Sequence, residues 1–165
     1  QGDILYGGRT DERERFIEPT LLDMHISLSD ADADAKASSH EVLTEEIFGP
    51  VLPVLTFNNI ADVAGYITRR EKPLAFYYFG READGWSIIR HTSSGGACIN
   101  DTIMHIANEH VPFGGVGNSG MGSYHGEESY RAFSHYRTVV ATGTWIDLPF
   151  RYMPYKMFSL VKKIV

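Results

Sequence analysis

The sequence has 165 residues, of which 43% are hydrophobic and 22% charged, a composition ordinary for a soluble globular domain with a core of its own. Its formal net charge of −6 argues against a nucleic-acid partner, because phosphate binding needs a basic surface. No stretch approaches the roughly 20 apolar residues of a membrane helix. The single cysteine, Cys98, excludes an intramolecular disulfide and a zinc cluster, so we expect a reducing, cytoplasmic setting.

The first half of the chain predicts two strands separated by a loop. Residues 16–22 are a short strand candidate that carries Pro19, which suggests an edge or an irregularity. Residues 27–39 are rich in Ser, Asp and Ala and nearly free of bulky apolar side chains, so we expect a mobile loop there. Residues 50–57 are the second strand candidate. A helix should follow, with capping Asn residues and then apolar residues at helical spacing: Asn58 and Asn59, then Ile60, Val63, Ala64 and Ile67.

The second half alternates strands and helices. Pro73 ends the preceding helix, because proline cannot continue it. The aromatic run 74–79 predicts a strand buried on both faces. Gly85 should weaken the helix in which it lies. The further predicted elements are a helix at 81–91, a strand at 96–100, a glycine-rich loop at 108–122, a helix at 127–136 and a strand at 137–146. This alternation predicts an α/β fold with a largely parallel sheet.

Two patterns suggest a ligand site but favour a structural interpretation. The run from Gly115 to Gly120 fits G-x-G-x-x-G, yet the segment before it is short and broken by Pro112, so a structural loop is favoured over a dinucleotide site. Four acidic residues stand at positions of a calcium-binding loop, but Ala35 occupies the position that requires glycine. These four, which we interpret as a solvated acidic loop, are Asp30, Asp32, Asp34 and Glu41. We expect no metal site.

Cys98 and the histidines give no catalytic signal from spacing alone. Cys98 lies in an apolar segment, where a free cysteine is usually a small buried hydrophobe, and nothing near it in the sequence would activate the thiol. The histidines lack the i, i+4 spacing of a metalloprotease helix.

Several motifs, in their order along the chain, resemble one known family. Residues 45–50 read EEIFGP, and residues 112–122 read PFGGVGNSGMG. Together these segments resemble the aldehyde dehydrogenases. Residues 124–126 and 133–135 resemble the class 3 branch of that family, which includes fatty and coniferyl aldehyde dehydrogenases. Further matching segments are residues 70–75, 94–101 and 151–155. The resemblance covers nearly the whole chain.

The resemblance implies NAD(P)-dependent oxidation of an aldehyde to a carboxylic acid, in which a cysteine thiolate attacks the aldehyde and hydride passes to the nicotinamide. In the family the catalytic cysteine, the glutamate that activates water and the cofactor-binding domain lie upstream of EEIFGP. No catalytic residue is therefore expected in this chain, which we expect to be a fragment that is inactive alone. The resemblance implies a partial catalytic domain at residues 1–136, then an oligomerisation strand and tail at 137–165 that favour a homodimer. A non-catalytic assembly module stays open as the alternative.

Some family roles transfer by position. Glu46 matches the glutamate that holds the nicotinamide ribose hydroxyls, and Phe48 matches the aromatic residue beside the nicotinamide; without the motif, Glu46 would be an ordinary surface or helix-capping acid. His125 matches a residue beneath the class 3 site. The residues expected to form an apolar wall for the aldehyde, with plain core packing as the alternative, are Ile103, Ile106, Ala107 and Phe113. The segment 24–44 is longer than the family pattern, and the small Ala107 implies a wider aldehyde tunnel.

Overall fold

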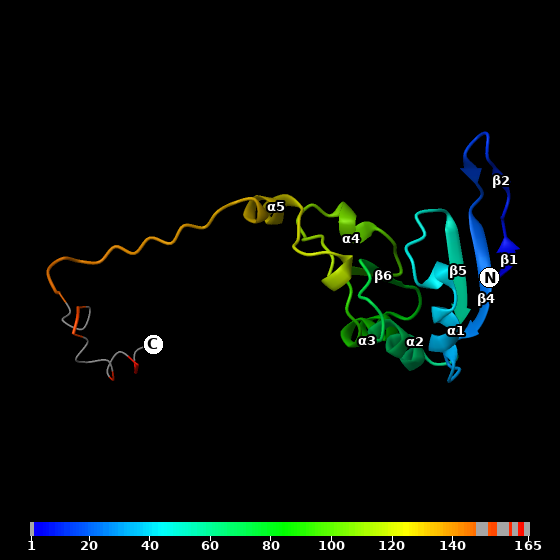
Figure 1. Ribbon diagram of the computed structural model, residues 1–165, viewed down its shortest axis with the longest axis horizontal. Helices are drawn as coiled ribbons and strands as arrows, with labels where there is room; N and C mark the ends of the chain where they lie inside the picture. Colours follow the sequence, from blue (N-terminus) through cyan, green and yellow to red (C-terminus); the bar gives the residue numbers. More distant parts are fainter. Residues whose placement is uncertain (1, 148–151, 155–158, 160–161, 164–165) are drawn as a thin grey trace. The chain divides into compact units, whose positions relative to one another are not determined.

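The structure is a computed structural model that describes residues 2–147, 152–154, 159 and 162–163. The chain divides into two compact units, Gln1–Phe133 and Ser134–Val165. The elements of the first unit, labelled in Figure 1 where there is room, are β1 (Asp3–Tyr6), β2 (Thr10–Asp11), β3 (Phe16–Ile17), β4 (Thr20–Ser27), α1 (Ala33–Ser38), η1 (Glu41–Leu43), β5 (Val51–Thr56), α2 (Ile60–Thr68), β6 (Ala75–Tyr78), α3 (Glu82–His91), β7 (Gly96–Ile99), α4 (Met104–Ala107), η2 (Gly117–Ser119) and α5 (Gly126–Ala132). This is the mixed α/β class that the alternating pattern predicts.

The first sheet has the strand order β1-β4-β5, with β4 parallel to β5 and antiparallel to β1. The blue and cyan arrows of β4 and β5 run side by side in Figure 1. The prediction of one continuous strand at 16–22 is wrong. The structure has two strands there: β3 ends before Pro19 and pairs with β2, and β4 begins after Pro19. Proline has no N–H for the ladder, so the chain leaves one sheet and enters another at this residue.

The prediction of a mobile loop at 27–39 is wrong, because this segment contains helix α1. Ala33 and Ala37 lie one turn apart and are 3% and 1% exposed, against Met24 and Ile26 of β4. Small side chains let a helix approach a sheet closely, so a segment without bulky residues still joins the core. The partly buried residues that complete this core are Leu22, Val42, Leu43, Leu55 and Tyr66.

The predictions for β5 and α2 are confirmed. β5 occupies residues 51–56, inside the predicted 50–57. Asn59 is the N-cap of α2, and its side-chain oxygen accepts a hydrogen bond from the backbone N–H of Ala61 at 2.9 Å. The helix ends at Thr68, shortly before Pro73.

The second parallel pair is β6–β7, with Ala75 in register with Gly96. Every residue of β6 is half-buried, so the expected burial on both faces is wrong for this chain, in which β6 has only β7 beside it among the described strands. The α3 helix joins the two strands, as predicted. Gly85 of α3 is buried against Tyr78 and Ile99, which explains why a residue that disfavours helix stands there.

The last predicted helix and strand differ most from the structure. Helix α5 spans residues 126–132 rather than 127–136, and Phe133 is its C-cap. Residues 137–147 form no strand; Val140 is 81% exposed and Trp145 is 85% exposed. A strand needs a neighbour for its backbone groups, and the described chain offers none here. Of the family-like segment 151–155, residues 151 and 155 lie outside the described residues.

Within the described residues, none of the helices combines the length and apolar character needed to cross a bilayer.

Candidate functional site

Four aromatic rings from four parts of the chain form a contact series, which we call the ring cluster: Tyr77, His105, Phe113 and His125. The Phe113 ring lies between two imidazoles, with centroids 5.8 Å from His105 and 5.6 Å from His125. Tyr77 contacts the His105 ring in an edge arrangement, with 5.7 Å between the ring centroids. Offset and edge contacts of this kind hold aromatic side chains in fixed orientations. The sequence interpretation names Phe113 and His125, and the structure brings them together.

The glycine-rich loop closes beside this cluster. The backbone N–H groups of Phe113 and Tyr124 each donate to the carbonyl of the other at 2.9 Å, so the segment between them is closed like a hairpin. Gly114 passes so close to the carbonyl of Gly122 that a Cβ at Gly114 would overlap it. Inside the loop, Ser119 Oγ accepts from Val116 N–H at 2.9 Å. These contacts support the structural interpretation of the G-x-G-x-x-G run over a dinucleotide site.

Two ring nitrogens in the cluster are buried and have no hydrogen-bond partner among the described residues: Nε2 of His105 and Nδ1 of His125. His125 has a left-handed φ of 86°, and its backbone N–H donates to Ser129 Oγ at 2.8 Å. A buried polar atom without a partner costs about 1–3 kcal/mol, so such atoms are rare in structural positions. Both therefore mark the ring cluster as a place where a polar group of a ligand or a water could bind.

The other predicted wall residues lie in or directly before α4, the short helix that carries His105. Ile103 precedes it with a left-handed φ of 63° and is 60% exposed. Ile106 is half-buried and Ala107 is exposed. A β-branched residue rarely adopts left-handed backbone, and such strain is frequent at ligand-binding loops. The structure thus places Ile103, Ile106 and Ala107 in the same short segment as the ring cluster's His105.

Glu46 and Phe48 lie outside the ring cluster, between η1 and β5. Both are exposed, and Phe48 is 90% exposed. Phe48 also has a left-handed φ of 45°. An exposed carboxylate followed two residues later by an exposed aromatic ring leaves both groups free to contact a ligand.

The structure shows one pairing that spacing alone misses. Cys98 of β7 is half-buried, and its Sγ lies 3.4 Å from Nδ1 of His105. The sequence shows no such group close to this thiol along the chain, and the fold brings an imidazole to it from a different element. His105 lies seven positions after Cys98, on α4, a helix that the sequence pattern does not predict. The sequence signal that could have indicated this pairing is a histidine in the segment that follows the strand.

The acidic segment is held by ion pairs. Asp34 accepts from Arg70 Nη1 and Arg69 Nε, at 2.6 Å each, and these hydrogen bonds lower the pKa of its carboxyl. Lys36 lies 2.9 Å from Asp32, and that contact raises the pKa of the Lys36 ammonium.

Among the described residues, no group of three or more His, Cys, Asp or Glu side chains could hold a metal ion.

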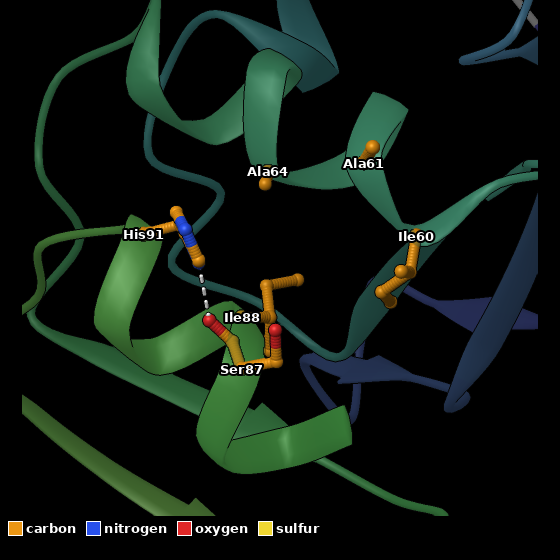
Figure 2. Close-up of a pocket in the computed structure, with 6 residues that line it drawn as sticks. All are labelled: Ile60, Ala61, Ala64, Ser87, Ile88 and His91. Carbon is orange, nitrogen blue, oxygen red and sulfur yellow. Dashed lines mark hydrogen bonds between the residues drawn. The ribbon is translucent and has the colours of Figure 1, made fainter. Parts of the chain in front are cut away.

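A hollow of about 330 Å³ lies between α2 and α3. Figure 2 shows Ile60, Ala61 and Ala64 facing Ser87, Ile88 and His91 across it. The imidazole of His91 is already engaged within α3, because its Nδ1 donates a hydrogen bond to the backbone oxygen of Ser87 at 2.7 Å. None of the residues that the sequence singles out for a site lines this hollow.

The comparison with protein families decides the identity. The aldehyde dehydrogenase family matches residues 1–139. The chain belongs to the aldehyde dehydrogenase family. Its relatives include several class 3 members, as the motifs imply.

Three aldehyde dehydrogenases illustrate the similarity. The chain is 42% identical over 164 residues to the 4,4'-diaponeurosporen-aldehyde dehydrogenase of Staphylococcus aureus, covering 98% of this chain and 33% of that protein. It is 45% identical to aldehyde dehydrogenase family 3 member A2 of Rattus norvegicus, covering 85% and 27%. It is 41% identical to the "aldehyde dehydrogenase, dimeric NADP-preferring" of Canis lupus familiaris, covering 92% and 32%. The chain therefore spans about a third of the length of these relatives.

Solved aldehyde dehydrogenases share the fold. The substrate-bound state of Staphylococcus aureus AldH matches with a TM-score of 0.75 at 42% identity, over 98% of this chain and 33% of that one. A Mycobacterium tuberculosis aldehyde dehydrogenase complexed with NAD+ matches with a TM-score of 0.68 at 23% identity, over 88% and 28%. The second likeness shows the fold alone.

Proposed function

We propose that this chain supplies the C-terminal part of an NAD(P)-dependent aldehyde dehydrogenase of class 3 type that oxidises aldehydes to carboxylic acids. The observation that carries the proposal is the 42% identity to a relative of which the chain matches one continuous third. The motif residues and the ring cluster then assign two tasks to this chain, one toward the cofactor and one toward the aldehyde.

Toward the cofactor, the chain contributes Glu46 and Phe48. The two carboxylate oxygens of Glu46 can accept hydrogen bonds from two adjacent ribose hydroxyls, and the exposed face of Phe48 can cover the nicotinamide ring. Their exposure in this chain fits such a role, since neither side chain is engaged in a core. When bound, the nicotinamide would accept hydride from the aldehyde carbon. The dog relative is named NADP-preferring, and the choice between NAD and NADP for this chain stays a part of the proposal.

Toward the aldehyde, the chain contributes an apolar wall from Ile103, Ile106, Ala107 and Phe113. The Phe113 ring is fixed between His105 and His125, so it would present a rigid surface to an aliphatic or aromatic aldehyde. His125 would hold the loop from beneath through its contact with Phe113. Fatty and coniferyl aldehydes are the substrate classes that the class 3 resemblance favours.

The chain alone should be inactive, because Cys98 is its only cysteine and does not stand at the position of the family's nucleophile. A second candidate function is a non-catalytic assembly module. The exposed apolar side chains of the tail favour it, with Val139 at 72% and Val140 at 81% exposure. In either case we propose a homodimer formed through residues 137–146.

A chimera tests the proposal. The matching C-terminal third of the Staphylococcus aureus relative is replaced by this chain, and NAD(P)H absorbance is followed with NAD or NADP and a panel of aliphatic and aromatic aldehydes. We expect the chimera to oxidise aldehydes and this chain alone to give no signal above the blank. A folded chimera without activity would favour the assembly module, and sustained activity of the chain alone would contradict the proposal outright.

A further inference from the structure

Cys98 and His105 form a thiol–imidazole pair, and the proposed dehydrogenase function does not use its thiol. Sγ of Cys98 lies 3.4 Å from Nδ1 of His105, within reach of an S–H···N hydrogen bond. The contact joins β7 to α4, the helix that packs on it. A nucleophile with a base within hydrogen-bond reach is the central part of the general arrangement of an activated nucleophile.

The imidazole is held in place from several sides. Tyr77 and Phe113 contact its ring at 5.7 Å and 5.8 Å between centroids. Gly96 lies two residues before Cys98, on the same face of β7, and a Cβ there would overlap the His105 ring. Glycine at this position therefore lets His105 lie against the strand beside the sulfur.

Within the described residues, Nδ1 of His105 contacts the thiol and Nε2 has no hydrogen-bond partner. Nε2 is buried and unpaired, so Nδ1 carries the only hydrogen-bonding contact of this ring with another side chain in the described structure. If the ring served packing alone, an apolar ring would fill the same space without leaving a buried nitrogen unpaired. Cys98 and His105 are both half-buried rather than enclosed, so part of each residue is exposed to solvent.

We propose that Cys98 is a modification site at which soft carbon electrophiles, of the class of α,β-unsaturated carbonyl compounds, add to the thiol with His105 as the base. The sulfur forms a bond to the β-carbon of the electrophile while the π bond between the α- and β-carbons breaks, and its electron pair moves to the α-carbon and carbonyl. The thiol proton moves to Nδ1 of His105 and then to the α-carbon. Nothing is oxidised or reduced and no group leaves, so no co-reactant is required.

The test measures the alkylation rate of the whole chain at neutral pH with N-ethylmaleimide and with an α,β-unsaturated aldehyde. Peptide mapping locates the adduct, and Cys98→Ser is the matched control, since Cys98 is the only thiol in the sequence. We expect a single adduct at Cys98, formed faster in the folded chain than in the same chain unfolded in concentrated urea. A cysteine that is merely buried would react more slowly when folded, and that result would overturn the proposal.

His105→Phe separates the base from the packing. Phenylalanine preserves an aromatic ring between Tyr77 and Phe113 and removes the unpaired nitrogen, so circular dichroism should show an intact fold. The alkylation rate should fall by about tenfold or more. A fall of tenfold is no larger than the rate enhancement that a positioned base contributes. Gly96→Ala is the second variant: it should displace the ring without removing either reactive group, with the same fall in rate. Unchanged rates in both variants would refute the role of His105.

Discussion

The carboxylate of Asp34 accepts a hydrogen bond from the guanidinium of Arg70 at 2.6 Å, across 36 residues of chain. The same guanidinium lies over the Tyr66 ring, 3.4 Å from its centroid, and Tyr66 packs against the core between β4 and α1. Arg69 donates to the other oxygen of Asp34. The pair therefore ties helix α1, which the sequence does not reveal, to the end of α2.

Replacing Asp34 by Asn should lower the free energy of unfolding by about 0.5–1.5 kcal/mol, since two partly exposed ion pairs contribute about 0.2–1 kcal/mol each. The pKa of this carboxyl in the folded chain is lowered from its ordinary value of 3.8. The ionised carboxylate therefore stabilises the fold above that pH, and this stabilisation is lost as the pH falls through the lower folded pKa. Urea unfolding followed by tryptophan fluorescence measures both effects. Glu71→Gln, an exposed acid beside Arg70, is the control and should change little. Equal stability of Asp34→Asn and the unmodified chain at neutral pH would contradict this role.

Two glycines in helices should respond to alanine in opposite directions. At Gly85 a Cβ would lie 2.8 Å from Tyr78 Cδ1 and 3.0 Å from Ile99 Cδ1, both parts of packed side chains. Overpacking costs about 1–3 kcal/mol, which exceeds or offsets the gain of about 1 kcal/mol in helix propensity, so Gly85→Ala should destabilise the chain. At Gly65 the nearest atom is Arg69 Nη1 at 3.0 Å, the end of a flexible side chain, so Gly65→Ala should stabilise it. Thermal unfolding of both variants checks the signs, and stabilisation by both would show that α3 is not tightly packed on β6 and β7.

Glu46→Gln, made in the active chimera, should weaken binding of the nicotinamide half of the cofactor. Hydrogen bonds to a charged group contribute about 1.5–3 kcal/mol, which corresponds to a loss of roughly 10- to 150-fold in affinity. Cofactor titration by fluorescence and the hydride-transfer rate are the measurements. Glu45→Gln, the neighbouring acid in the same motif, is the matched control. If Glu46→Gln behaves like Glu45→Gln, the assignment of the ribose hydroxyls to Glu46 is wrong.

Residues 137–146 should pair with a second copy of the chain. The segment reads RTVVATGTWI, rich in strand-forming residues, and it is exposed in the single chain. A twofold dimer would bury this edge on both copies at once. Light scattering should give a species larger than 18.5 kDa, and Val140→Pro should shift the mass downward because proline removes a ladder donor. Val140→Thr keeps the N–H and the β-branched shape and should leave the dimer intact. A monomer of the unmodified chain at tens of micromolar would count against the pairing.

Cys98→Ala in the active chimera should keep most of the dehydrogenase activity, because the resemblance implies that the catalytic cysteine lies upstream of the EEIFGP motif. The chimera's turnover of a saturated aldehyde measures this without involving alkylation of the thiol. A loss of several orders of magnitude in a folded variant would mean that Cys98 takes part in the oxidation itself.

The sequence by itself determined the family and the elements whose signals are local. The EEIFGP and PFGGVGNSGMG motifs identify the family, Asn59 caps α2 through its own side chain, and the apolar run of β5 is continuous along the chain. Such signals depend on neighbours a few residues apart, so they can be interpreted without a fold.

Only the tertiary structure decided the features that depend on distant partners. Residues 33–38 form a helix because Ala33 and Ala37 fit closely against β4 and Asp34 reaches the arginines that end α2. Gly85 and Gly96 are required by rings and side chains that approach them from other elements. Cys98 gains its imidazole neighbour through the packing of α4 on β7. The segment 137–146 has strand propensity but no strand in the single chain, since hydrogen-bond partners for a strand come from a neighbour and not from its own residues.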